Sequence, residues 1–171
     1  MPTRARELPH VDPHKRRGVL YRAFARFAST RAIGWFSRHV MWKVDPWLMR
    51  VTGGRVGIGL LLPTALLETR GARSGEPRRN VVIYFHDGDR VTIIASKLGL
   101  PKHPAWFHNL RAHPDDVRLG GQALRAQFVD DDGERARIWD LADRVFPGYA
   151  AYRKRADEAG RTIPIVQLTP R

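Results

Sequence analysis

The chain of 171 residues has the size of one ordinary domain, and its 43% hydrophobic content, with five Trp and seven Phe residues, is enough to bury a core. It contains no cysteine, which excludes disulfides, thiolate metal sites and cysteine nucleophiles. The formal net charge of +13 is concentrated early, because residues 1–56 hold twelve Lys and Arg residues against three Asp and Glu residues. No apolar run reaches the roughly 18 to 20 residues that a membrane-spanning helix needs, and we expect no secretory signal peptide in the polar first seventeen residues.

The N-terminal third is predicted to lie outside the main domain. Residues 1–17 are polar, contain three prolines and are expected to form a disordered basic leader. Residues 18–50 place apolar side chains at helical spacing, as at Leu20, Phe24 and Phe27, with arginines between them. This amphipathic basic helical segment has two interpretations: it packs on the following domain, or it lies on an anionic membrane surface with its tryptophans in the headgroup layer.

A glycine-rich connector at residues 52–59 predicts a boundary, so that residues 51–171 form the main domain. Six short strands are expected within it, at residues 65–69, 77–85, 90–96, 117–119, 123–129 and 163–168. Asp87-Gly88 is a tight-turn signal between the second and third strands. Helices are expected after Pro104 and from the acidic Asp130–Asp132 run to about Val145. This pattern predicts a mainly β fold with flanking helices (α+β), built on a small antiparallel barrel.

The chemistry is concentrated between residues 67 and 109. This stretch contains the basic glycine turn 71–75, the strand-end sequence Ser96-Lys97-Leu98-Gly99, and the sequence from His103 to Asn109. Guanidinium groups and unpaired backbone amides bind phosphate, and an aromatic side chain can shield a planar ring from water. The stretch therefore predicts a site for a planar cofactor with a phosphate tail.

The same residues resemble a known family. The sequence Thr69-Arg70-Gly71-Ala72-Arg73-Ser74-Gly75-Glu76-Pro77-Arg78-Arg79-Asn80 is followed in order by Ala95-Ser96-Lys97, Lys102-His103-Pro104-Ala105-Trp106, Asn109-Leu110 and Arg161-Thr162-Ile163-Pro164. Over about residues 66–167 this set is similar to the deazaflavin-dependent nitroreductase family. The resemblance implies a split β-barrel that binds reduced coenzyme F420 and transfers its hydride to a quinone-like, nitroaromatic or other conjugated acceptor.

The resemblance also implies roles for particular residues. The expected cofactor-binding residues are Arg73, Ser74, Gly75, Arg78, Asn80, Ser96, Lys97, Leu98, Gly99, Trp106 and Asn109. The expected catalytic residues are Tyr149 and Tyr152, which match a late tyrosine cluster that closes over the acceptor in the family. The chain departs from the family pattern at Ala72, at Ile83 and at Phe146, where the family often has a basic residue, a tyrosine and a tyrosine, respectively.

Structural roles remain open for some of these residues. Asn80 can satisfy a strand end instead of a heterocycle, Lys97 can be a solvated loop residue, and Trp106 can be a core residue. Two other functions remain open as well. The first is a reductase with the same barrel that binds FMN, and the second is a non-catalytic basic module for a membrane or, less favoured, for nucleic acid. We expect a cytoplasmic location, with the inner face of the plasma membrane as the alternative, and either a monomer or a homodimer.

Overall fold

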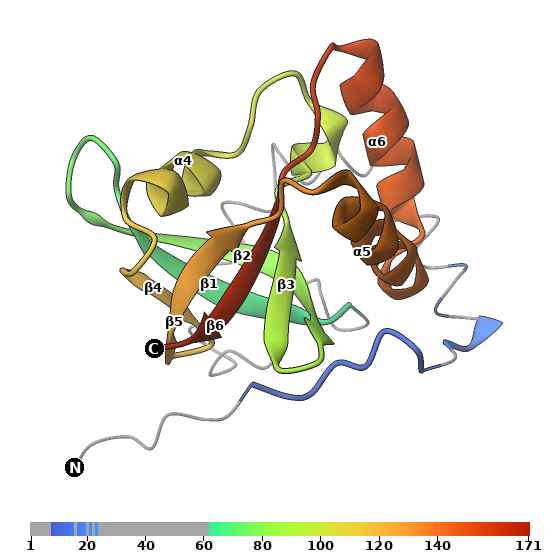
Figure 1. The fold of residues 1–171 in the computed structure, drawn as a ribbon, viewed down its shortest axis with the longest axis horizontal. Coiled ribbons are helices and arrows are strands. Elements are labelled where there is room, and N and C mark those ends of the chain that lie inside the picture. Colours follow the sequence, from blue (N-terminus) through green and yellow to red (C-terminus); the bar gives the residue numbers. More distant parts are fainter. Residues whose placement is uncertain (1–7, 16, 20, 22, 24–61) are drawn as a thin grey trace.

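The computed structural model describes residues 8–15, 17–19, 21, 23 and 62–171 (Figure 1). Most of the predicted amphipathic segment 18–50, and the connector 52–59, lie outside the described residues. The domain boundary predicted there stays a prediction. Among the described residues, no helix is long and apolar enough to cross a membrane.

The described strands form a closed antiparallel barrel, which confirms the predicted fold class. Its strands are β1 (Thr64–Arg70), β2 (Pro77–Asp87), β3 (Arg90–Ile94), β4 (Val117–Leu119), β5 (Gln122–Phe128) and β6 (Ile165–Pro170). The order around the barrel is β1-β2-β3-β6-β5-β4, and β4 pairs with β1 to close it. Gly88, with a φ of 60°, forms the β2–β3 turn predicted at Asp87-Gly88.

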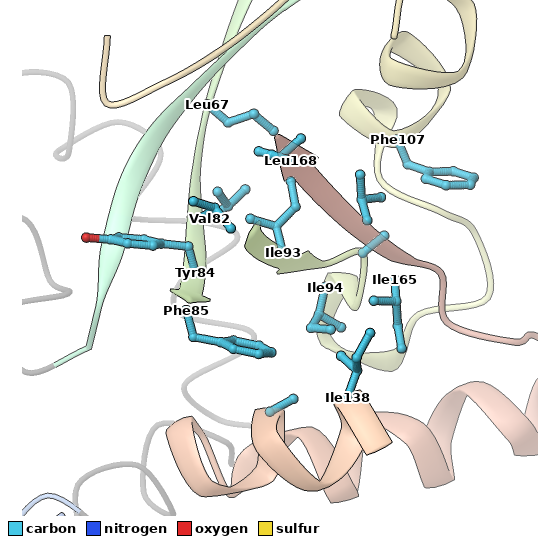
Figure 2. Close-up of a cluster of buried hydrophobic side chains, with 14 of the residues drawn as sticks. Leu67, Val82, Tyr84, Phe85, Ile93, Ile94, Phe107, Ile138, Ile165 and Leu168 are labelled. Atoms are coloured by element: carbon cyan, nitrogen blue, oxygen red, sulfur yellow. The ribbon is translucent and has the colours of Figure 1, made fainter. Parts of the chain in front are cut away.

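Two apolar layers stabilise this arrangement (Figure 2). Leu67, Ile93 and Leu168 are fully buried and meet inside the barrel. Phe85, on the other face of β2, points toward the helical layer that contains Ile138. Because β3 lies between the two layers, four of its five residues are buried, and it shows no polar alternation.

Within residues 62–171, three helices and one short 3-10 turn surround the barrel: α4 (Ala105–Ala112), α5 (Asp132–Val145), α6 (Gly148–Glu158) and η2 (Lys97–Gly99). The acidic start predicted for α5 is confirmed, since Asp131 is the N-cap and its Oδ1 accepts a hydrogen bond from the Glu134 backbone N–H at 2.8 Å. α6 was not predicted as a helix. It follows α5 at once, and the two helices lie together on one side of the barrel (Figure 1).

Residues 8–15, which belong to the predicted disordered leader, contact the barrel in the structure. The His86 backbone N–H donates to the Val11 carbonyl at 2.9 Å, and the Val11 N–H donates to His86 Nδ1 at 3.0 Å. The Tyr84 hydroxyl donates to the Pro9 carbonyl at 2.9 Å, and the Leu8 side chain lies against Gly120. These contacts give the polar, proline-containing run backbone and side-chain partners on β2, and it passes below the barrel in Figure 1.

Candidate functional site

The turn between β1 and β2 is closed by its own backbone. The Gly71 N–H donates to the Glu76 carbonyl at 2.8 Å, and the Gly75 N–H donates to the Gly71 carbonyl at 2.9 Å. Gly75 has a φ of 69°, a conformation that glycine adopts without strain. A Cβ atom on Gly71 would lie 2.5 Å from Ser74 Oγ and 3.2 Å from the Glu76 carbonyl oxygen, so a larger residue here would displace the Ser74 side chain. The turn therefore has a defined shape that holds its side chains in fixed directions.

Ser74 connects this turn to the start of β2. Its Oγ accepts hydrogen bonds from the Glu76 N–H and from Arg78 Nη2, both at 3.3 Å. Arg73 makes no hydrogen bond or ion pair with the part of the chain that the structure describes. The turn thus carries one guanidinium that is oriented by a serine and one that is available to a ligand.

Asn109 holds the turn against α4. Its Oδ1 accepts a hydrogen bond from the Ala72 N–H, and its Nδ2 donates to Thr69 Oγ1, each at 3.0 Å. The residue is only 8% exposed. Both ends of the amide therefore bind the protein, which makes Asn109 a positioning residue for the turn.

A pocket of about 650 Å³ opens beside these residues, and we call it the turn pocket. It is lined by Gly71, Ala72, Arg73, Ser74, Arg78, Arg79, Asn80, Ala105, His108 and Asn109. Three of these residues are arginines, and the described lining contains no carboxylate. Such a set favours an anion, and guanidinium groups bind phosphate oxygens through paired N–H donors.

Five of the predicted cofactor residues thus meet at one pocket: Arg73, Ser74, Arg78, Asn80 and Asn109. Gly75 lies on the other side of the turn, in a separate hollow of about 400 Å³ with Arg70, Arg79 and Arg118. His108, an exposed residue of α4, lines the turn pocket as well. His108 is three residues after Ala105 in α4, and residues with this spacing lie on the same face of a helix, so the sequence could have indicated its position.

The predicted residues Ser96 to Gly99 form the η2 turn. Lys97, Leu98 and Gly99 all have positive φ angles of 45°, 60° and 75°. A Cβ on Gly99 would lie 2.5 Å from the Tyr152 carbonyl oxygen, so η2 packs tightly on α6. Two consecutive non-glycine residues in the left-handed region are unfavourable and persist only where the surroundings hold them.

Arg161 supplies that support, a role that sequence reasoning missed. Its side chain is buried, and its guanidinium donates to the carbonyl of Ala95 at 2.5 Å, to that of Ser96 at 3.1 Å and to that of Leu100. Its Nε donates to His103 Nδ1 at 3.0 Å. Burial lowers the pKa of Arg161, and burial followed by the Arg161 charge lowers the pKa of His103. The neutral imidazole that results is the form that can accept the Arg161 hydrogen bond.

Lys97 joins the η2 turn to the residues that precede α4. Its Nζ donates to the His103 carbonyl at 3.3 Å. The His103 ring centre lies 5.9 Å from that of His108, which lines the pocket. The η2 turn and the basic turn are therefore linked through the residues that precede and begin α4.

The three aromatic candidates lie outside the lining of the turn pocket. Trp106 is 7% exposed and belongs to the core, which was one of its two predicted interpretations. Tyr149 and Tyr152 are buried in α6, with ring centres 6.1 Å apart, and both rings pack against Phe146. Burial is the main cause that raises the pKa of Tyr149 above its ordinary value and the pKa of Tyr152 to about 12. Both phenols are therefore neutral and protonated near neutral pH.

Comparison with known proteins shows the family to which the chain belongs. Residues 41–170 match the family described as F420H2-dependent quinone reductase. The chain belongs to this family. The protein is therefore an oxidoreductase that uses reduced F420, and the family match supports quinone-like acceptors.

Individual relatives agree with this assignment. An F420H2-dependent quinone reductase of Mycobacterium tuberculosis is 36% identical over 147 residues, which cover 80% of this chain and 97% of the relative. A solved structure described as an F420-H2 dependent reductase aligns with a TM-score of 0.53 and 32% identity, over 62% of this chain and 93% of that one. Another, described as a domain-swapped dimer, aligns with a TM-score of 0.55 and 30% identity, over 73% and 96% of the two chains.

These findings also narrow the predictions. The family match and the Mycobacterium tuberculosis relative name F420, so the FMN alternative is unsupported. They name quinones as acceptors, so the nitroaromatic acceptor and the nitroreductase label are unsupported. The family match is to a reductase, so the alternative function as a non-catalytic basic module is unsupported. Association with a membrane or nucleic acid, and the oligomeric state, stay predictions.

Proposed function

We propose that the turn pocket binds the phosphate-bearing tail of F420 for the reduction of a quinone. The observation that carries this proposal is the meeting of Arg73 and Arg78 at a pocket whose described lining has no carboxylate. Arg79 also lines the pocket, but its Nε forms an ion pair with Glu68 at 2.8 Å. A phosphate requires such compensation, because an anion that leaves water needs charged or dipolar donors around it. The donor chemistry of the pocket therefore fits the cofactor.

We propose that the η2 turn extends this site toward the cofactor ring. The ammonium of Lys97 is within reach of the sequence that leads into α4, and Arg161 fixes the backbone around it. Asn109 and Arg161 act as positioning residues. The Asn109 amide is hydrogen-bonded to Ala72 and Thr69 at the basic turn, and the Arg161 guanidinium donates to the Leu100 carbonyl next to the η2 turn. A fixed site limits the motion of the reacting groups, which raises the fraction of productive encounters.

When bound, reduced F420 supplies the hydride, and a quinone that accepts it also takes up one proton to become the hydroquinone. Tyr149 and Tyr152 are the proposed residues on the acceptor side, and because both are buried, this role requires the quinone to displace part of what covers them. As neutral phenols they can donate a hydrogen bond to a quinone oxygen. We expect Tyr152→Phe to lower kcat with quinone and to leave the Kd for F420 unchanged. An unchanged kcat would remove Tyr152 from this role.

The central test is a titration of the full-length protein with F420. Arg73→Gln and Arg78→Gln should each weaken binding by about 10- to 150-fold, because a hydrogen bond to a charged group contributes about 1.5–3 kcal/mol. Lys154→Gln is the matched control: it removes one exposed cation from α6, outside the lining of the turn pocket. Equal affinity in wild type, Arg73→Gln and Arg78→Gln would show that the phosphate lies elsewhere.

A further inference from the structure

A third cavity lies between the N-terminal run and the place where α5 meets α6, and we call it the junction pocket. It has a volume of about 550 Å³ and is lined by Pro13, His14, Lys15, Arg17, Asp143, Arg144 and Pro147. None of these residues lines the turn pocket. In Figure 1 the N-terminal run passes from below the barrel toward the lower end of α5, on the side away from α4.

The charge of the junction pocket is strongly positive. It contains the cations Lys15, Arg17 and Arg144, and Asp143 is the one carboxylate among its described lining residues. That carboxylate is already paired, since it accepts two hydrogen bonds from Arg153 at 2.9 and 2.6 Å. No ion pair joins the three lining cations to a carboxylate of the described residues. Their charges therefore face the pocket without compensation.

Arg17 is the most informative of these cations. Its Nε–H is buried and has no hydrogen-bond acceptor among the described residues, and its guanidinium carbon lies 4.9 Å from the centre of the Tyr21 ring. A buried donor without an acceptor is unfavourable, and proteins rarely leave one in place without a reason. No hydrogen bond among the described residues uses this guanidinium, so its other N–H donors can serve an anion in the pocket.

Two polar contacts join the N-terminal run to the end of α5 beside the pocket. The Tyr21 hydroxyl donates to the Val145 carbonyl at 2.6 Å, and Arg144 Nη1 lies 3.1 Å from His14 Nδ1. Pro147 is the N-cap of α6, a helix with no side-chain cap and no acidic residue in its first turn. The positive end of that helix adds to the field of the three cations.

We propose that the junction pocket binds a phosphate group. Two arginines with paired N–H donors suit the oxygens of phosphate, and the pocket is far larger than one such group, so the phosphate belongs to a larger molecule. It is either the headgroup of a phospholipid or part of a soluble phosphate ester. This site is separate from the one proposed for F420, and its occupation does not depend on the cofactor.

The first experiment follows the full-length protein by NMR during titration with inorganic phosphate, at constant ionic strength maintained with chloride. The backbone amides of His14, Arg17 and Gly148 should shift with phosphate and not with chloride. Arg17→Gln combined with Arg144→Gln should weaken this response by about tenfold or more, whereas Lys154→Gln should leave it unchanged. An unaltered F420 affinity in the double variant would show that its fold is intact.

The second experiment separates the two sources of the phosphate. Wild type and the double variant are sedimented with phosphatidylcholine vesicles, with and without phosphatidylglycerol. Binding that requires phosphatidylglycerol and is lost in the double variant identifies a lipid headgroup. Amide shifts with phosphate but no such sedimentation identify a soluble ester. The proposal is overturned if the three amides do not respond to phosphate, or if Lys154→Gln weakens the response as much as the double variant does.

Discussion

Arg161→Leu should destabilise the η2 turn and weaken F420 binding together. The Arg161 guanidinium binds the carbonyls of Ala95, Ser96 and Leu100 and the ring nitrogen of His103. Leucine leaves all four acceptors without this donor. Ala95 is fully buried, so water cannot readily replace the lost hydrogen bond there, whereas Ser96 and Leu100 are partly exposed.

The expected size follows from these burials. A buried acceptor without a partner costs about 1–3 kcal/mol, and the partly exposed acceptors cost less. Removing the buried charge offsets part of this loss. We therefore expect the free energy of unfolding to fall by about 3 kcal/mol, which lowers the Tm of a domain of this size by about 6–12 °C.

Thermal unfolding followed by circular dichroism measures the loss of stability, and hydrogen exchange shows whether the loss is local to the η2 turn. The amides of Gly99 and Leu100, which donate to Ser96 and Lys97 carbonyls at 2.9 and 3.1 Å, should exchange faster in the variant. Arg161→Lys keeps the charge but cannot reach four acceptors, and should fall between wild type and Arg161→Leu. A variant with leucine that keeps the wild-type Tm, exchange rates and F420 affinity would refute the role given to Arg161.

Three other predictions follow from the site. Asn109→Ala should release the 71–76 turn and raise the Kd for F420, with a stability loss of about 1–3 kcal/mol; an unchanged Kd would mean that the turn keeps its shape without the amide. Gly99→Ala should cost clearly more stability than Gly121→Ala, because both have positive φ but only Gly99 has the Tyr152 carbonyl in the way; equal losses would mean that backbone strain alone matters. The lowered pKa of His103 means that the unfolded chain binds more protons, so this histidine should destabilise the fold as pH falls below its ordinary value of 6.5. His103→Gln should make the Tm less dependent on pH in that window, and an identical pH profile would contradict the assignment.

Local signals were sufficient to predict most of the barrel. The six strands and the Asp87-Gly88 turn follow from short apolar runs separated by turn residues, and the start of α5 follows from Asp131. The same signals were too weak for α6, whose buried residues Gly148, Tyr149, Tyr152 and Ala156 form a narrow stripe in a polar sequence. Its position depends on packing against α5 and η2, which no local pattern contains.

The candidate site, too, was predictable only where its residues are adjacent in the sequence. The turn with Arg73 and Ser74 could be predicted because its glycines and cations are adjacent in the chain. The role of Arg161 could not, because its acceptors at Ala95 and Leu100 are about sixty residues away and are backbone carbonyls, which any residue provides. Asn109 was expected to contact a ligand, and this stays a prediction. Its hydrogen-bond partners Ala72 and Thr69 lie 37 and 40 residues earlier in the chain, so the local sequence did not indicate its positioning role.

The pairing of the N-terminal run with β2 has a practical consequence for recombinant work. The family match begins at residue 41, which makes that position an attractive start for a shortened protein. Such a version would lose Val11 beside His86 and Pro9 above the Tyr84 phenol, and would expose apolar surface on β2. The family match thus begins at residue 41, while the hydrogen bonds to the barrel strand β2 extend at least thirty residues further upstream.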